Sequence, residues 1–150
     1  MFFDTDFLKN DEICLQLVHA SGADPVKGWV PAYYFNICLP DGTPVGKCDL
    51  RIGHNEKLYI GGNIGYSVDE PYRGHHYAEH ACRLIIPLMQ ELNLKSICIT
   101  ANPDNIPSRK TCERIGCELE SIVAIPQKYR FVCSGDTKKC RYILRIPEKA

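Results

Sequence analysis

The chain has 150 residues, enough for a single domain with a substantial hydrophobic core. Its 18 basic and 18 acidic residues balance, which excludes the broad basic field that draws a protein to nucleic acid or to a membrane surface. No apolar run is long enough to span a membrane. Met1-Phe2-Phe3 is followed at once by Asp4 and Asp6, unlike a secretion signal. We therefore expect one cytoplasmic domain over residues 1–150.

The cysteine content also indicates a reducing compartment. The chain has nine cysteines, an odd number spread evenly, and no Cys-x-x-Cys pair. They are Cys14, Cys38, Cys48, Cys82, Cys98, Cys112, Cys117, Cys133 and Cys140. This pattern favours free thiols over a disulfide framework. The spacings do not match common zinc motifs, so we expect no metal site.

The first half of the chain reads as strands joined by short turns. Glu12–Val18 alternates apolar and polar residues, and His19–Pro31 is rich in turn residues. A meander of three antiparallel strands is predicted to follow, over 33–39, 44–52 and 58–68. Gly61 and Gly62 interrupt the last of these, which indicates a β-bulge or the close approach of another backbone. Nearby aromatic residues suit core and rim packing or the wall of an acceptor site: Trp29, Tyr33 and Tyr34.

A strand, a tight basic loop and a helix follow at Ile64–Ala78. Apolar residues from Tyr77 onward recur on one face, which predicts a helix from about His76 to Leu92. The loop therefore lies where a helix begins, and its free backbone N–H groups point toward any anion in front of it. Arg73, His75 and His76 add positive character, and no carboxylate occurs between Tyr72 and Ala78. The pattern predicts a phosphate-binding loop.

The second half alternates strands with one more helix. Lys95–Ala101 is predicted to be a buried strand, parallel to the one ending at Val68 because a helix connects them. A second helix is predicted to begin after Asp104 or Asn105, either of which can cap it, and Gly116 is a fitting end. Two further strands are predicted over 117–126 and 140–146, with a polar connection over 127–139.

Two of these segments resemble a known family. Val68–Ala78 resembles the acyl-CoA signature of the GNAT superfamily of N-acetyltransferases, in which Arg/Gln-x-x-Gly-x-Gly/Ala opens a helix. Arg73 and Ala78 match its first and last positions, whereas His76 stands where the family usually has glycine. Residues 105–117 are similar to the Asn-x-x-Ser…Glu-x-x-Gly-Phe helix of the ribosomal-protein and antibiotic N-acetyltransferase branches.

The resemblance implies a fold and a co-substrate. The fold is a mixed α/β GNAT fold, with a central, mostly antiparallel mixed sheet of six to seven strands flanked by helices. The sheet is splayed between the Val68 strand and the Ile97 strand, and acetyl-CoA lies in the resulting V. Because a thioester is already activated, its transfer to an amine would need no cofactor beyond acyl-CoA and no covalent enzyme intermediate.

The resemblance also implies binding residues for acetyl-CoA, carried over by motif position. Pantetheine would add to the strand residues Tyr66, Ser67 and Val68, and the Val68 N–H would stabilise the oxyanion. A bulge near Gly65–Val68 would free that N–H. The pyrophosphate would contact the loop residues Arg73, Gly74, His75, His76, Tyr77 and Ala78. Asn105 and Ser108 would approach pantetheine from the other side, with Arg109 or Lys110 near the ribose phosphate.

The groups that move protons are less evident. Relatives place a carboxylate on the strand before the loop, but this chain has Gly62 and Asn63 there. His54, Glu118 and Glu120 stay open as general bases. Many relatives have, at the position of Cys112, a tyrosine that protonates the departing thiolate. Cys112 is therefore either a general acid or a packed core residue.

Three functions remain open at this point. The first is an N-acetyltransferase acting by direct attack in a ternary complex, with a small amine or a protein N-terminus as acceptor. The second is a catalytically silent acyl-CoA-binding module, and the third is a phosphate-binding interaction domain without CoA. The family analogy also suggests a homodimer through the last strands.

Overall fold

The computed structural model describes residues 5–130 and 137–149. Its strands are β1 (Cys14–Ser21), β2 (Ala32–Cys38), β3 (Pro44–Arg51), β4 (Ile64–Val68), β5 (Ser96–Ala101), β6 (Glu118–Ala124) and β7 (Lys138–Arg145). Its helices are α1 (Glu56–Gly61), α2 (Tyr77–Glu91), α3 (Ile106–Arg114) and α4 (Gln127–Arg130), with a 3-10 turn, η1, at Glu70–Tyr72.

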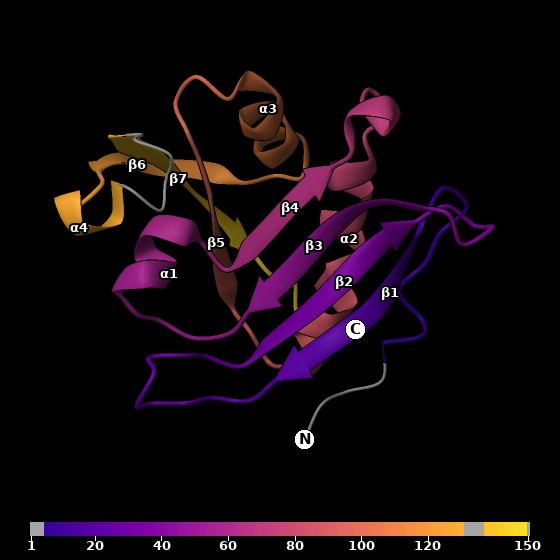
Figure 1. The fold of residues 1–150 in the computed structure, drawn as a ribbon, viewed down its shortest axis with the longest axis horizontal. Coiled ribbons are helices and arrows are strands. Elements are labelled where there is room, and N and C mark those ends of the chain that lie inside the picture. Colours follow the sequence, from indigo (N-terminus) through magenta and orange to yellow (C-terminus); the bar gives the residue numbers. More distant parts are fainter. Residues whose placement is uncertain (1–4, 131–136, 150) are drawn as a thin grey trace.

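The strands form two antiparallel sheets that lie next to each other. The first has the order β1-β2-β3-β4 and the second β5-β7-β6. In Figure 1, α2 lies behind the four-stranded sheet, while α3 lies beside the upper end of β4. The predicted mixed α/β fold is confirmed, including the splay between β4 and β5, which belong to different sheets.

Alternation along the strands decides which face of the first sheet is buried. Tyr33, Phe35 and Ile37 on β2 face the core, and so do Cys48 and Leu50 on β3. Helix α2 covers this face with its predicted apolar stripe, which includes buried Ala81, Cys82, Ile85, Leu88 and Met89. The opposite face carries the intervening residues of β2, β3 and β4, and it is the face toward the viewer in Figure 1.

The predicted strand over 58–68 is wrong in its first half. Residues Glu56–Gly61 form helix α1, and only Ile64–Val68 is a strand. The helix is capped by Asn55, whose side-chain oxygen accepts a hydrogen bond from the Leu58 N–H at 2.8 Å. Gly62 ends it with a φ of 79°, a left-handed conformation that favours glycine. Capping chemistry thus outweighs the apolar spacing of Leu58 and Ile60.

Close backbone approach is the reason for glycine at position 62. A Cβ there would lie 3.0 Å from the Cys98 carbonyl oxygen and 3.1 Å from the Thr100 nitrogen, both on β5. Next to it, the Asn63 N–H donates to the Cys98 oxygen at 2.7 Å, and the Asn63 side chain accepts from the Cys98 N–H at 2.9 Å. Of the two sequence alternatives, close approach is confirmed and a bulge is not.

The remaining predictions match to within a few residues. β1 continues to Ser21 with an irregularity between Leu17 and His19, so the predicted loop after it is shorter than expected. The predicted connection over 127–139 begins with helix α4, and residues 131–136, with Cys133, lie outside the described residues. In the described part, eight cysteines are free, and no cluster of three metal-binding side chains occurs. None of the described helices has the length and apolar character needed to cross a bilayer.

Candidate active site

Strands β4 and β5 diverge from a closed end to form a V-shaped cleft. They are hydrogen-bonded at Asn63 and Cys98. Beyond that point, Gly65 and Tyr66 on one side and Thr100 and Ala101 on the other line a cavity of about 190 Å³. Both strands therefore lead away from the closed end in the same direction, as predicted for parallel neighbours.

The register of β4 turns two of its amides toward this cleft. Asp69 donates to the Val45 oxygen at 2.8 Å, which makes this pair a hydrogen-bonded position of the β3–β4 ladder. In an antiparallel pair, every second residue then points its N–H and C=O away from the partner strand. Those residues are Val68 and Tyr66. The predicted bulge is wrong, because the β3–β4 register runs unbroken from Gly46–Val68 to Leu50–Ile64. Alternation frees the Val68 N–H without it.

The basic loop forms the wide end of the cleft. His76 adopts the left-handed conformation, with φ 62° and ψ 27°, and is the residue before the first turn of α2. Histidine therefore takes up the backbone shape for which the family uses glycine, at some cost in strain. Gly74 also has a positive φ, 93°, and has open space where a Cβ would lie. The first N–H groups of a helix have no partner within the helix, so those of α2 stay the predicted contacts for the pyrophosphate.

A larger cleft of about 710 Å³ lies between this loop and helix α3. Every predicted co-substrate residue except His75 lines it, and the His75 ring stacks on Tyr77 at 5.3 Å. Lys110 and Arg114 also line it, while no carboxylate occurs among the described residues of its wall. Arg109 turns away to the Tyr142 hydroxyl at 2.9 Å, so of the two residues predicted near the ribose phosphate only Lys110 lines the cleft.

The cationic side chains also hold the loop in place. Arg73 donates from Nε to the Val68 oxygen at 2.9 Å, so its side chain ties the loop to the end of β4. Arg114 donates to Nδ1 of His76 at 2.8 Å across the cleft mouth. This bond requires His76 to present an unprotonated Nδ1. The positive wall is thus partly organised by the protein itself.

Helix α3 meets β4 through one hydroxyl pair. Asn105 caps the helix by accepting from the Ser108 N–H at 3.3 Å. The Ser108 hydroxyl lies 2.8 Å from the hydroxyl of Tyr66, which lines both cavities of the cleft. Burial raises the pKa of the Tyr66 phenol, so it keeps its proton at neutral pH. Sequence reasoning assigned Tyr66 a backbone role and missed this side chain.

Cys112 lies behind Tyr66 rather than on the cleft wall. Its side chain is fully buried, and its Sγ is 4.0 Å from the Tyr66 hydroxyl. A hydrogen bond from Cys117 lowers the pKa of the Cys112 thiol, with a smaller contribution from Tyr66, while burial opposes both. Any proton from Cys112 would reach the cleft through Tyr66.

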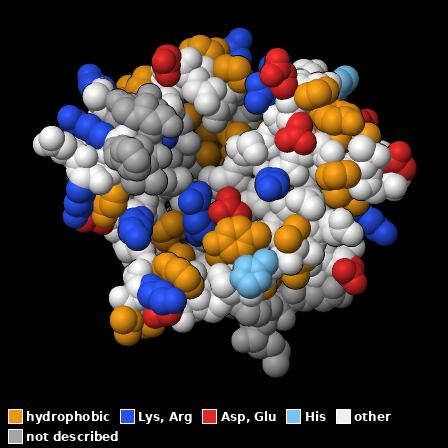
Figure 2. Space-filling view, in the orientation of Figure 1, with side chains coloured by type: hydrophobic (Ala, Val, Ile, Leu, Met, Phe, Trp, Pro, Cys, Tyr) orange, Lys and Arg blue, Asp and Glu red, His pale blue; other side chains and the backbone are white. Residues whose placement is uncertain are grey.

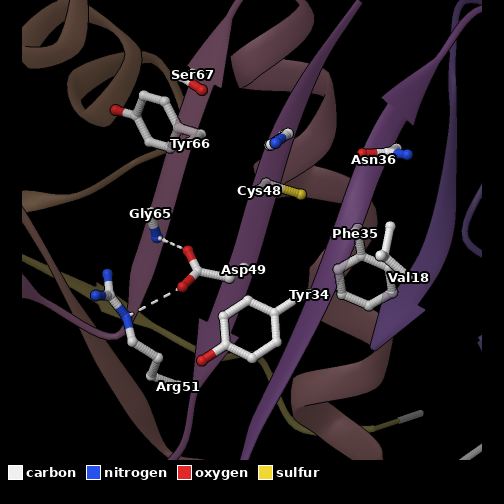
Figure 3. A pocket seen from close by; sticks show the side chains of 11 residues that line it. Val18, Tyr34, Phe35, Asn36, Cys48, Asp49, Arg51, Gly65, Tyr66 and Ser67 are labelled. Carbon is white, nitrogen blue, oxygen red and sulfur yellow. Dashed lines mark hydrogen bonds and ion pairs between the residues drawn. The ribbon is translucent and has the colours of Figure 1, made fainter. Parts of the chain in front are cut away.

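A second hollow, of about 490 Å³, lies on the face of the sheet that the helices leave bare. Figure 2 shows basic, acidic and hydrophobic side chains gathered there, beside a histidine. Tyr34, Asp49 and Gly65 form one cross-strand row of this face, and Asn36, Lys47 and Ser67 form the next. Figure 3 shows the carboxylate of Asp49 lying between Gly65, Arg51 and Tyr34.

Asp49 is the acidic residue of this hollow, and sequence reasoning did not find it. Burial raises the pKa of its carboxyl group, opposed by the Arg51 charge and by the Gly65 N–H. The three bases left open by the sequence lie elsewhere. Glu120 forms an ion pair with Arg141 at 3.0 Å, and neither it, His54 nor Glu118 lines the hollow. The sequence did contain a signal for Asp49, since polar residues alternate along β3. The strand register was needed to place Asp49 opposite Gly65.

The fold and the cleft together define a family. Residues 12–118 match the acetyltransferase (GNAT) domain, so the chain belongs to the GNAT acetyltransferase family. No curated protein matches the chain.

Solved structures show the same fold. A GNAT-family acetyltransferase from Bacillus anthracis is 22% identical, with a TM-score of 0.61 over 75% of this chain and 65% of that one. The ribosomal-protein-S5-alanine acetyltransferase of Vibrio fischeri is 21% identical, with a TM-score of 0.62 over 77% and 62%. A microcin C7 self-immunity acetyltransferase, in complex with acetyl-CoA and AMP, is 21% identical, with a TM-score of 0.62 over 77% and 61%. The chain thus matches less than two thirds of the length of each.

Proposed function

We propose that this protein transfers the acetyl group of acetyl-CoA to a primary amine by direct attack in a ternary complex. The observation that carries the proposal is the cleft between β4 and β5, closed at Asn63 and bounded at its wide end by a cationic wall and the start of α2. A cleft with this polarity suits a long ligand that has an anionic end and an uncharged reactive end.

The residues of the cleft fit acetyl-CoA in sections. The N–H groups of Gly74 to Ala78 would hold the pyrophosphate, with Lys110 near the further phosphate. The outward amides of Tyr66 and Val68 would pair with the pantetheine amides, as an added strand does. Asn105 and Ser108 border the same path on α3. When bound, acetyl-CoA supplies a thioester that is already activated for acyl transfer.

Two groups of the chain would stabilise the developing charges. The Val68 N–H, unused by the β3–β4 ladder, is the donor for the carbonyl oxygen as it gains negative charge. The Tyr66 hydroxyl is the donor nearest the departing sulfur, because it borders both cavities and holds its proton. Cys112, 4.0 Å behind it, would resupply that proton.

The acceptor would approach from the opposite face of the sheet. The hollow on that face shares Gly65 and Tyr66 with the narrow cavity of the cleft, so the two spaces meet at β4. Its aromatic and polar wall suits either a small amine or a protein N-terminus. The residues that close its edge, Val18 and Tyr34, come from β1 and β2.

Binding and turnover test the proposal separately. Saturating acetyl-CoA should raise the thermal midpoint of the wild-type protein, and Lys110→Ala should weaken this effect several-fold in ligand concentration. Lys95→Ala, an exposed change outside the cleft, is the control. Release of free thiol from acetyl-CoA is then measured across a panel of small amines and peptides. Stabilisation without thiol release would favour the silent acyl-CoA-binding module. No stabilisation would overturn both the transferase and the silent acyl-CoA-binding module.

A further inference from the structure

We propose that Asp49 receives the acceptor's ammonium group and acts as the general base of the reaction. The inference rests on the proposed function, and it assigns the proton acceptor that the strand before the loop lacks. Asp49 lies on β3. This strand pairs with β4, the strand along which acetyl-CoA would bind.

The carboxylate reaches β4 because the residue opposite has no side chain. Asp49 pairs with Gly65, and a Cβ built on Gly65 would lie 2.5 Å from Oδ1 of Asp49. The φ of Gly65 is not in the left-handed region, so backbone strain does not require glycine here. The requirement is space, because the carboxylate of Asp49 occupies the position where a Gly65 side chain would lie.

This position lies at the border between the two spaces. Gly65 and Tyr66 line both the hollow on the sheet face and the narrow cavity between the sheets. An amine bound in the hollow beside Asp49 would therefore be adjacent to β4, along which the thioester would bind. Among the described residues that line the hollow, Asp49 is the one carboxylate.

The carboxylate is held by two partners and still faces the hollow. Oδ1 accepts a hydrogen bond from the Gly65 N–H at 3.0 Å, and Oδ2 lies 3.4 Å from Nε of Arg51. The side chain keeps 20% of its surface exposed, which leaves room for an incoming N–H donor. Two fixed partners orient the group, as a positioned base requires.

The charged and titratable surroundings come from several strands. Lys47 and Arg51 flank Asp49 on β3, and Tyr34 lies beside it on β2. His19 on β1 stacks on Tyr34 at 5.9 Å, and Lys139 on β7 lines the narrow cavity. Burial raises the pKa of the Asp49 carboxyl group, whereas the Arg51 charge and the Gly65 N–H lower it. Because burial prevails, the pKa of Asp49 is raised toward the working range of a general base.

The proton balance of the step is complete with these groups. The acceptor arrives as an ammonium ion and gives one proton to Asp49, which frees the nitrogen lone pair. The N–C bond forms as the C–S bond breaks, and the nitrogen's second proton leaves as the amide forms. The departing thiolate takes one proton from Tyr66, and the nitrogen's second proton replaces it through the solvent of the cleft, so Tyr66 and Cys112 end each turnover protonated. The proton on Asp49 passes to solvent, so one proton is released for each turnover.

A purely structural role would give a different result from a base. In that case Asp49 would only hold Gly65 and Arg51 in position. Asp49→Asn would then lower the rate by the same factor at every pH. The test is kcat/KM for the best amine of the panel, measured from pH 6 to 10 for wild type, Asp49→Asn and Asp49→Glu. Asp11→Asn, an exposed aspartate outside both clefts, is the matched control.

A general base predicts a loss in Asp49→Asn of about a hundredfold at pH 7. The rate of this variant should then climb about tenfold per pH unit up to the pKa of the free amine, since only neutral amine reacts. Asp49→Glu should recover part of the loss, and the thermal shift with acetyl-CoA should stay unchanged. If Asp49→Asn kept the pH profile of the wild type, or lost less than threefold in kcat/KM, Asp49 would not be the general base. The proposed function would be unaffected. Wild type that releases no thiol would instead overturn the proposed function on which it rests.

Discussion

The two edges of β4 are bonded very differently. On one edge, β3 pairs with it from Gly46–Val68 to Leu50–Ile64 without a break in register. On the other edge, β5 is bonded at Asn63 and then diverges. The first edge fixes the position of the strand, and the second leaves its amides unpaired. The strand that borders the proposed acetyl-CoA cleft is thus paired along one edge and diverges from its neighbour along the other.

Gly62, just before β4, and Gly65, within it, show the same contrast at the level of single atoms. Gly62 lacks a side chain because the backbone of β5 passes 3.0 Å from where its Cβ would be. Gly65 lacks one because the carboxylate of Asp49 lies over it. Gly62 therefore lets β5 approach at the closed end of the cleft. Gly65 leaves room for the Asp49 side chain at the border of the cleft.

The largest expected effect comes from breaking the closed end. Asn63→Ala removes the bonds from the side chain to the Cys98 N–H and to the Arg51 and Gly53 carbonyls. At about 1 kcal/mol for each bond, the free energy of unfolding should fall by about 3 kcal/mol. Urea denaturation measures it. Asn36→Ala on the bare sheet face should change it by less than about 0.5 kcal/mol, and an equal loss in both would contradict the role of the closed end.

Next in size is the effect of filling the close approach of β5. Gly62→Ala places a methyl group against two backbone atoms at a φ of 79°. Overpacking and backbone strain together should cost about 2–3 kcal/mol. Gly28→Ala is the matched control, since its φ of 69° is similar but nothing lies within 4 Å of its Cβ position. That variant should lose about 1 kcal/mol from strain alone. Equal losses would show that contact with β5 contributes nothing.

A smaller effect is expected from removing the hydroxyl that spans the open edge. Tyr66→Phe should lower kcat by about tenfold, or about 1.4 kcal/mol, because the departing sulfur loses its donor. The KM for acetyl-CoA should change little. Cys112→Ala should lower kcat less, since Cys112 acts through Tyr66. Tyr59→Phe, an exposed change, is the control, and an unchanged kcat in Tyr66→Phe would remove this residue from the mechanism.

The smallest effect concerns the paired edge and its pH dependence. The raised pKa of Asp49 means that the folded protein holds this proton at higher pH than the unfolded chain. Wild type should therefore gain stability relative to Asp49→Asn as the pH falls through the folded pKa, until the unfolded value of about 3.9 is passed. Above the folded pKa, Asp49→Asn should be at least as stable as wild type. Urea midpoints at pH 5 and pH 8 measure the difference, and the opposite trend would show that Arg51 outweighs burial.

Local chemistry explains which features the sequence could predict. The apolar stripe of α2, the cap at Asn105 and the loop between Arg73 and Ala78 are set by neighbours in the chain, so they were predicted correctly. Helix α1 was missed because Leu58 and Ile60 mimic a strand, while the Asn55 cap decides the outcome. The bulge at Gly65–Val68 was wrong because it was invoked to free an amide that simple alternation already frees.

The residues that were missed depend on contacts far apart in sequence. Asp49 becomes a candidate only when the register sets it against Gly65, 16 residues later. Tyr66 becomes one only when α3 brings Ser108 to its hydroxyl, 42 residues later. No local pattern carries either pairing. Motif position was enough to propose a co-substrate side, whereas proposing an acceptor side required the fold.

The closed end at Asn63 also bears on how products leave. If acetyl-CoA binds as proposed, a cleft closed at one end would require the thiol product to leave past the loop at Gly74. The acetylated amine, on the bare side of the sheet, would leave by a separate route. The proposal therefore predicts that the two products can be released in either order.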